Sequence, residues 1–371
     1  MIALPYSRID PRLLEVFPLQ QRTNIARIEE VAIEPASLPP AIGPQLERQI
    51  ETLATDIRRA RARGASVMLT YGAHLVKNGC GLLVNTLIEN GWLTHLATQG
   101  AGVIHDWEFA FLGASGEWVR DNAPVGRFGS WEETGHWLNL AVIAGAAEGL
   151  GFGEAVGRLI EADGLDLPSA QELRAAIRED PDHELTAARA DLLQTIEQFG
   201  LRQGRQEVSH PFRRHSILGC AHRHRVPLTV HPGIGYDIIV NHPLYHGGAI
   251  GRAATTDVRL FTQSVDGLDG GIYLSIGSAI MSPQVFEKAF SAANNLRRRA
   301  GRPFLQNHRI VIVDIQAGGG WDWSLGEPPK NHPEYYLRYC KSFYRMGGIL
   351  QYLQCDNRVF LANLLARLKV E

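Results

Sequence analysis

The chain has 371 residues, of which 45% are hydrophobic and 20% charged, and its formal net charge is −2. This length allows one large α/β domain or two ordinary ones, and the near-neutral charge argues against a nucleic-acid-binding protein. Four cysteines without a C-x-x-C spacing suggest neither a zinc ribbon nor a redox pair, and no basic, apolar leader or long apolar run is present, so we expect a cytoplasmic protein.

The first part of the chain predicts an arm followed by a βαβ unit. Residues 1–44 are rich in proline, and we expect an arm that packs against the remainder. Residues 44–63 have the amphipathic period of a helix. A strand is predicted at 66–71, a helix ends at Gly91, and a second strand begins at Thr94. This alternation is typical of parallel βαβ folds.

The remainder of the chain returns to the same alternation after two interruptions. Residues 113–135 predict an ordered excursion without a sheet strand, and residues 154–205 a helical insertion. Asp356 is placed to cap a closing helix. Further strands are predicted at 226–230, 271–276, 309–315 and 349–353. We therefore expect an arm and one domain, 45–371, with a Rossmann-like, doubly wound, mostly parallel α/β sheet.

The most informative stretch is the glycine-rich turn after the second strand. Thr98, Gly100, Ala101 and Gly102 lie between a strand and a helix, an order that turns backbone N–H groups toward a phosphate. The spacing is not the strict G-x-G-x-x-G. In a doubly wound sheet the residues after each strand meet at one edge, where ligands bind. Glycine turns, acidic side chains and tryptophans at that edge suit a cationic ligand beside a dinucleotide.

Four segments resemble one known family. They read THLATQGAGVIHDWEFAF, GRFGSWEETG, HPGIGYDIIVNHP and GSAIMSPQVFEKA. On these segments the chain is similar to the deoxyhypusine synthase superfamily, in particular its prokaryotic deoxyhypusine synthase-like branch. The resemblance implies an NAD-dependent homotetramer with active sites at subunit interfaces. Such an enzyme oxidises a polyamine such as spermidine and transfers its aminoalkyl group, through an imine on a lysine, to a protein lysine or a free amine.

The resemblance also implies roles for individual residues. The cofactor-binding residues would be Gly72, Ala73, His74, Thr98, Gly100, Ala101, Gly102, Asp106 and Asp356. The substrate-binding residues would be Asp237, Trp321, Asp322, Glu327 and Glu334. The catalytic lysine would be Lys341, with Lys330 as a second candidate. The family's Trp-Gly-Lys signature is absent, because Lys341 follows Tyr339 and Cys340.

Three alternatives stay open on the same residues. Asp356 could serve only as a helix cap. The chain could be an inactive NAD-fold binding protein. It could also be a metal-dependent hydrolase, because Glu133 and His136 have a ligand-like spacing and His231, His242 and His246 cluster around Asp237. We assign no metal from the sequence.

Overall fold

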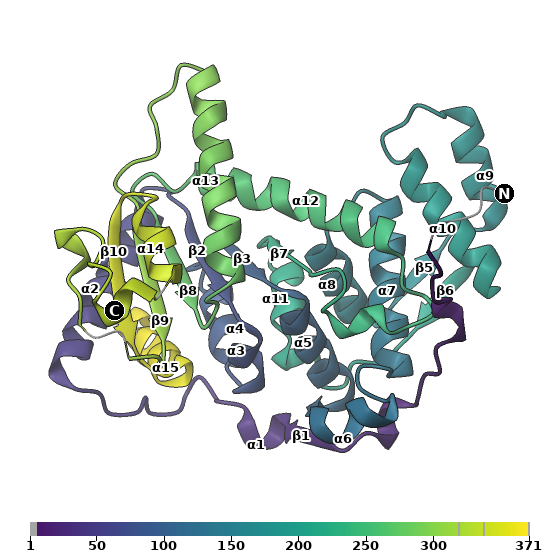
Figure 1. Ribbon diagram of the computed structural model, residues 1–371, viewed down its shortest axis with the longest axis horizontal. Helices are drawn as coiled ribbons and strands as arrows, with labels where there is room; N and C mark the ends of the chain where they lie inside the picture. The colour runs from purple at the N-terminus through teal and green to yellow at the C-terminus, as the bar shows by residue number, and fades with distance from the viewer. Residues whose placement is uncertain (1–5, 318–319, 337, 370–371) are drawn as a thin grey trace.

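The computed structural model describes residues 6–317, 320–336 and 338–369. Six strands form one parallel sheet in the order β10-β9-β8-β2-β3-β7 (Figure 1). They are β2 (Val67–Tyr71), β3 (His95–Thr98), β7 (Leu228–Val230), β8 (Ile272–Ile276), β9 (Arg309–Asp314) and β10 (Ile349–Gln354). The fold is therefore a Rossmann-like, doubly wound α/β fold, as the sequence predicts.

The sheet separates two hydrophobic cores because successive side chains of a strand point to opposite faces. In β2, Val67, Leu69 and Tyr71 face the larger core, and Met68 faces the smaller one. Strands β2 and β8 and the interior of β9 are buried on both faces, which explains their mostly apolar sequence.

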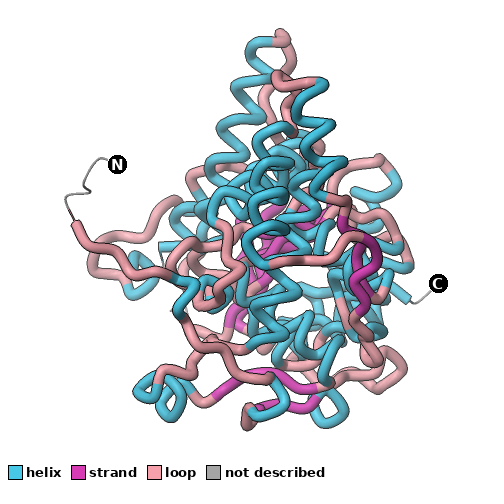
Figure 2. Tube along the Cα trace, turned by 90° about the vertical axis from the view of Figure 1, so that its right-hand side faces the viewer, coloured by secondary structure: helices cyan, strands magenta, loops and turns pink. Residues whose placement is uncertain are grey.

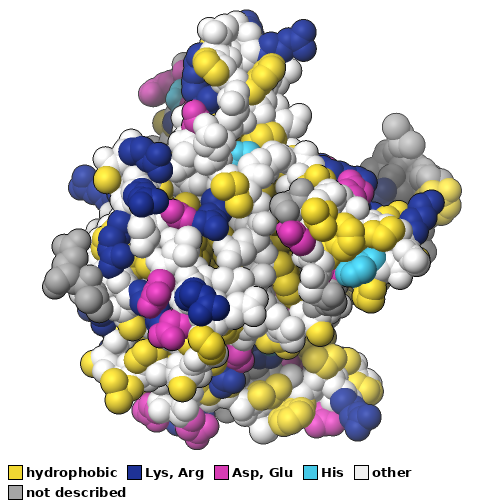
Figure 3. All heavy atoms as spheres, turned by 90° about the vertical axis from the view of Figure 1, so that its left-hand side faces the viewer, with side chains coloured by type: hydrophobic (Ala, Val, Ile, Leu, Met, Phe, Trp, Pro, Cys, Tyr) yellow, Lys and Arg dark blue, Asp and Glu magenta, His cyan; other side chains and the backbone are white. Residues whose placement is uncertain are grey.

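Helices cover each face. On the larger core lie α2 (Pro44–Ala62), α4 (Gly81–Glu89) and α15 (Asn357–Lys369). The smaller core is closed by α12 (Gly247–Asp266), α13 (Met281–Arg299) and α14 (Arg338–Tyr344). The side view in Figure 2 shows helices in front of the strands in the middle of the molecule. On the face in Figure 3, basic and acidic side chains are interspersed.

A helical region extends the molecule beyond β7 (Figure 1). The first residues of α8 cover this edge strand so closely that a Cβ on Gly153 would lie 1.8 Å from the carbonyl oxygen of Leu228. The elements of this region are α5 (Gly100–Leu112), α7 (Glu132–Ala147), α8 (Phe152–Ala162), α9 (Ala170–Glu179), α10 (Thr186–Phe199) and α11 (Ile217–Arg223), with the antiparallel pair β5 (Gly164–Leu167) and β6 (Gly204–Glu207). Among the described residues no single helix is long and apolar enough to cross a membrane; α7 and α8 meet that test only as a pair, bent by 114°.

The N-terminal arm lies along the underside of this region (Figure 1). Within it, β1 (Asn24–Arg27) pairs antiparallel with β4 (Ala114–Glu117). The expectation of no strand in 113–135 is therefore wrong, because β4 obtains its hydrogen bonds from the arm. The arm also contains η1 (Pro11–Leu13), η2 (Leu19–Gln21) and α1 (Ile28–Val31).

Candidate functional site at the carboxyl edge of the sheet

The order of the strands reverses between β2 and β8. From β2 the chain proceeds through β3 to β7 on one side, and then returns to build β8, β9 and β10 on the other. This is the 3-2-1-4-5-6 order of dinucleotide-binding sheets, in which the ligand lies beyond the carboxyl ends at the point of reversal.

The two loops at the reversal are in direct backbone contact. Gly72, after β2, donates its N–H to the carbonyl of Ile276 at 3.0 Å. A Cβ on Gly72 would lie 2.0 Å from the carbonyl oxygen of Gly277, so only glycine allows this approach. Gly277 has a φ of +58° and open space around its Cα. The reversal is thus lined by backbone and keeps room for a ligand above it.

A cavity of about 260 Å³ opens beside Gly277. Its lining comes from the ends of several strands: His74, Asn78, Gly277, Val313, Asp314, Ile315, Cys355, Asp356 and Asn357. Asn78, after α3 (Ala73–Lys77), donates to the side-chain oxygen of Asn357 at 3.0 Å, which fixes α15 beside the loop after β2. We call this space the crevice cavity.

Asp356, a predicted cofactor ligand, caps α15 at the wall of this cavity. Its carboxylate accepts the N–H of Arg358 at 2.8 Å and contacts the Arg358 guanidinium at 3.1 Å. The side-chain hydrogen bond from Arg358 lowers the pKa of Asp356 below its ordinary value. The alternative capping role is therefore observed directly.

Asp237 lies against the start of α5. A Cβ on Gly100 would be 2.1 Å from its Oδ2 atom, and the N–H of Gly233 donates to that oxygen at 2.7 Å. Asp237 is buried, and burial raises its pKa to about 6. The structure thus brings together Gly100 and Asp237, which are far apart in the sequence. Gly102 packs instead on Thr98, whose hydroxyl donates to the carbonyl of Tyr71 at 3.0 Å.

A second cavity, of about 280 Å³, begins at Asp237; we call it the α5 cavity. Lys77 of α3 lines it, while His74 and Asn78 of the same segment line the crevice cavity, so the two spaces flank α3. The α5 cavity is lined by Arg22, Lys77, Ala101, Ile104, His105, Glu108, Gly116, Glu117, Val119, Phe128, Tyr236, Asp237 and Ile238.

A buried ion pair lies in the wall of the α5 cavity. Arg22, from the arm, donates to both carboxylate oxygens of Glu108 at 2.7 Å, and both side chains are 1% exposed. Thr134 donates to the same carboxylate at 2.9 Å and Ser115 at 2.5 Å. Burial alone would raise the pKa of Glu108, but the charge and hydrogen bonds of Arg22 hold that pKa below its ordinary value.

This network orients His105. The Nδ1 atom of His105 lies 2.7 Å from the Ser115 hydroxyl. Because that hydroxyl donates its proton to Glu108, its oxygen accepts the Nδ1–H of His105, and the Nε2 atom is left with a lone pair. Burial lowers the pKa of His105 to about 4, so the imidazole is neutral at pH 7. The site therefore presents an oriented neutral base, which the sequence did not predict.

Asp106 faces away from both cavities and caps α11. Its carboxylate accepts the N–H groups of Ile217 at 2.8 Å and Leu218 at 3.3 Å, and the hydroxyl of Ser216. Burial raises its pKa to about 6, against these hydrogen bonds. The cap accounts for this carboxylate, and Asp106 lines neither cavity.

The predicted acidic loop lies at the other end of the sheet. Trp321, Asp322 and Glu334 line a cavity of about 690 Å³ beside α2 and β10, and residues 318–319 of this loop lie outside the described part. Glu334 accepts the N–H of Trp321 at 2.8 Å and the Nε1–H of Trp323 at 3.0 Å, and Glu327 pairs with Arg345 at 2.6 Å. Strands β9, β8 and β2 separate β10 from β3, so this loop and Asp237 do not share a cavity within the chain.

Lys341 belongs to that distant region as well. It lies on α14, and its Nζ atom is 3.8 Å from the centre of the Tyr335 ring, a cation–π contact. Lys330 is exposed. Neither lysine lines the two cavities at α3.

The predicted carboxylate–histidine cluster is divided. Glu133 accepts the N–H of Leu19 at 2.7 Å and so docks the arm. The neighbouring Glu132 instead contacts His136 at 3.6 Å and His242 at 3.3 Å. His231 packs against Thr229, and His246 caps α12.

No protein-family model and no curated protein matches the chain. Solved structures match it weakly. Unliganded AgrE gives a TM-score of 0.43 at 14% identity over 89% of this chain and 33% of AgrE. ArgZ, an arginine dihydrolase from the ornithine-ammonia cycle in cyanobacteria, gives a TM-score of 0.41 at 13% identity. The match covers 89% of this chain and 33% of ArgZ. A conserved LOR/SDH protein from Methanococcus maripaludis S2 gives a TM-score of 0.41 at 13% identity. The match covers 90% of this chain and 70% of that protein.

These likenesses correct the family expected from the sequence. The chain spans about a third of the length of AgrE and ArgZ. None of the structures named here is a deoxyhypusine synthase, so the expected resemblance to that superfamily is wrong. The expected aminoalkyl transfer from a polyamine is wrong with it. The glycine turns behind that resemblance recur in unrelated α/β sheets, whereas the Trp-Gly-Lys signature is missing. AgrE has also been solved with ornithine and NAD+.

Proposed function

We propose that the chain binds a nicotinamide dinucleotide across the reversal between β2 and β8 and oxidises a small amino acid held in the α5 cavity. The strand order is the observation that carries the first half of this proposal. The contact between Gly72 and Gly277 supports it, because a dinucleotide needs bare backbone at the point where it crosses the sheet. When bound, the cofactor supplies a hydride acceptor.

The charges in the α5 cavity favour a substrate that carries both a positive and a negative charge. Asp237 and Glu117 offer carboxylates to an ammonium group, while Glu108 is already neutralised by Arg22. Lys77 offers an ammonium to a carboxylate. A cavity of about 280 Å³ is small, so it suits an amino acid better than a long polyamine. Glu117 is held by Trp131 Nε1 at 3.0 Å and by the N–H of Gly129 at 3.1 Å.

The proton balance assigns His105 its role. A substrate ammonium must lose one proton before its carbon can give up a hydride; the hydride would pass to the bound cofactor, and the amine becomes a protonated imine. The Nε2 lone pair of His105 takes that proton. Ser115 keeps its ring oriented, and the Glu108 carboxylate stabilises the imidazolium that forms, while Arg22 holds Glu108 in place. Asp237 holds the substrate ammonium before the proton leaves.

The experiment is a screen of amino acids and simple amines with NAD+ and NADP+, read as the absorbance of the reduced cofactor. We expect turnover with at least one amino acid and a decrease in kcat of about 10²–10⁴-fold in His105→Asn. His183→Asn, on the loop between α9 and α10, is the matched control and should retain full activity. Cofactor binding without turnover of any amine would reject the oxidation, and an active His105→Asn would remove His105 from it.

A further inference from the structure

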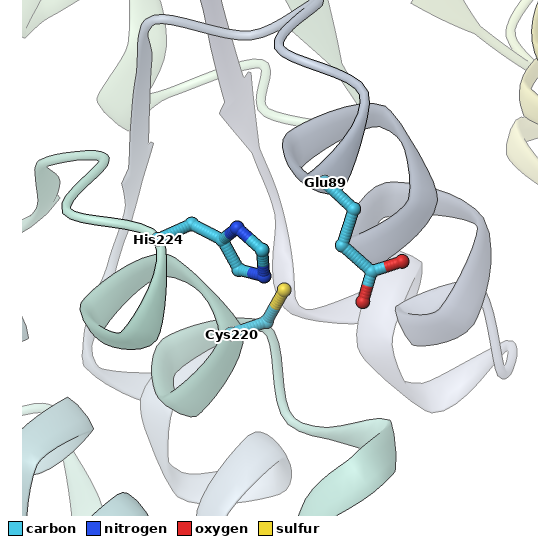
Figure 4. A group of neighbouring side chains, drawn as sticks. All are labelled: Glu89, Cys220 and His224. Carbon is cyan, nitrogen blue, oxygen red and sulfur yellow. The ribbon is translucent and has the colours of Figure 1, made fainter.

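A group of three metal-ligating side chains lies away from both cavities. Glu89 ends α4, and Cys220 and His224 lie one turn apart at the end of α11 (Figure 4). Their ligand atoms all lie within 4.8 Å of one another. Figure 4 shows the three side chains converging between the two helices.

The two helices are held in place independently of these side chains. Asn85 of α4 donates to the carbonyls of Arg214 at 3.0 Å and Ser216 at 3.2 Å, directly before α11. Asp106 caps the N-terminus of α11. Because both helices are anchored, the three donors are positioned before any ion binds, which lowers the cost of assembling a site.

We propose that Glu89, Cys220 and His224 bind one Zn²⁺ ion. A thiolate, an imidazole and a carboxylate are the ligands that zinc prefers, and three of them leave a fourth tetrahedral position for water. The three residues lie in or next to the last turns of α4 and α11, and the negative ends of helix dipoles favour a cation.

The charges around the group allow a divalent ion. Arg223 is 4.0 Å from Glu89, but its guanidinium contacts Glu161 at 3.2 Å, so Glu161 balances its charge. Binding converts the Cys220 thiol to a thiolate and releases one proton, after which the two negative ligands neutralise the ion. Because the thiol must lose its proton to bind the ion, zinc binding weakens as the pH falls.

The site joins α4 to α11 and has no ligand in common with the crevice or α5 cavity. Its effect is therefore on stability. Glu89 and His224 are exposed, so an ion reaches the site from solvent without unfolding.

The test uses the full chain, stripped with chelator, then dialysed against Zn²⁺ or Co²⁺. We expect one ion per chain, a thiolate-to-cobalt charge-transfer band and a higher Tm with metal. Cys220→Ser should abolish the band, and His224→Asn should weaken binding by more than the roughly 10–100-fold lost with an outer-shell partner. Cys80→Ser and His222→Asn are matched controls that should bind as the natural chain does.

Two results would overturn the site. One is a natural chain that takes up no more metal than Cys220→Ser. The other is a His224→Asn variant with unchanged affinity, and because His224 is exposed this variant tests the site even if Cys220→Ser fails to fold.

Discussion

At the scale of single residues, Asp237 is a buried carboxylate that accepts a hydrogen bond from the N–H of Gly233. It is 4% exposed, and burial raises its pKa to about 6 from an ordinary 3.8. A raised carboxyl pKa means that the folded state holds the proton more tightly than the unfolded state. The stability cost is therefore absent below pH 3.8, grows as the pH rises, and is complete above pH 6, where it reaches about 3 kcal/mol. A cost of this kind is typical of binding sites.

Asp237→Asn removes the ionisation and keeps an oxygen to accept the Gly233 N–H. We expect the variant to be more stable than the natural chain at pH 8, by up to about 3 kcal/mol, with the difference vanishing at about pH 3. It should also lose affinity for the amino acid. Urea unfolding at the two pH values measures the first effect, with the exposed Asp182→Asn as control. A variant less stable at pH 8 would show that Asp237 has a structural role.

Residue-level chemistry was only partly predictable from the sequence. The sequence identifies the glycine-rich stretch 94–111 as informative. The role of His105, however, depends on its contact with Ser115 and on the ion pair between Glu108 and Arg22, two residues that are 86 positions apart in the chain. No local sequence pattern predicts that ion pair, because the arm that carries Arg22 has no regular periodicity. The catalytic role of Lys341 was predicted only from a partial match to the Trp-Gly-Lys signature, and its partner in the structure is an aromatic ring.

At the scale of elements, the N-terminus of α15 gives a clear choice between two roles for Asp356. If the carboxylate is only a cap, Asp356→Ala should lose about 1 kcal/mol of unfolding free energy, and Asp356→Asn should retain it because asparagine caps equally well. If Asp356 also contacts the cofactor through its charge, Asp356→Asn should keep its stability but bind NAD+ more weakly. Chemical unfolding and NAD+ titration of both variants separate the two roles.

The strands that are buried on both faces could be predicted from the sequence, because burial makes their sequences mostly apolar. RIVIVDI and GIYLSI are apolar except for Arg309, Asp314 and Ser275, and β9 and β8 lie within those segments. The strand β4 was missed because its sequence, Ala-Ser-Gly-Glu, has no apolar period, and its partner β1 is in the arm. Helix α13 begins at Met281, and the hydroxyl of Ser282 in its first turn contacts Ser275 and Tyr273.

At the scale of the whole molecule, the site is a product of topology. The sequence predicts that strand ends meet at one edge, and Gly100 and Asp237 do meet there. The order of the strands in the sheet could not be predicted from the sequence. The sequence therefore could not show that the loop with Trp321 and Asp322 lies beside β10, whereas Asp237 lies beside Gly100, after β3. The residues that the sequence analysis places in one binding site therefore lie in two separate regions.

The central claim is that a dinucleotide crosses the sheet between β2 and β8, and Gly277 gives the most direct test. Asparagine tolerates the positive φ of this position but would put a side chain into the crevice cavity. Gly301, after α13, has a φ of +66° and open space, so Gly301→Asn carries the same backbone cost far from the cavity.

The measurement is the Kd for NAD+ by calorimetry in the natural chain, Gly277→Asn and Gly301→Asn. We expect the natural chain and Gly301→Asn to bind alike and Gly277→Asn to bind at least about tenfold more weakly, a loss of about 1.4 kcal/mol. Equal affinity in all three chains, or no binding by the natural chain, would contradict a dinucleotide site at the strand reversal.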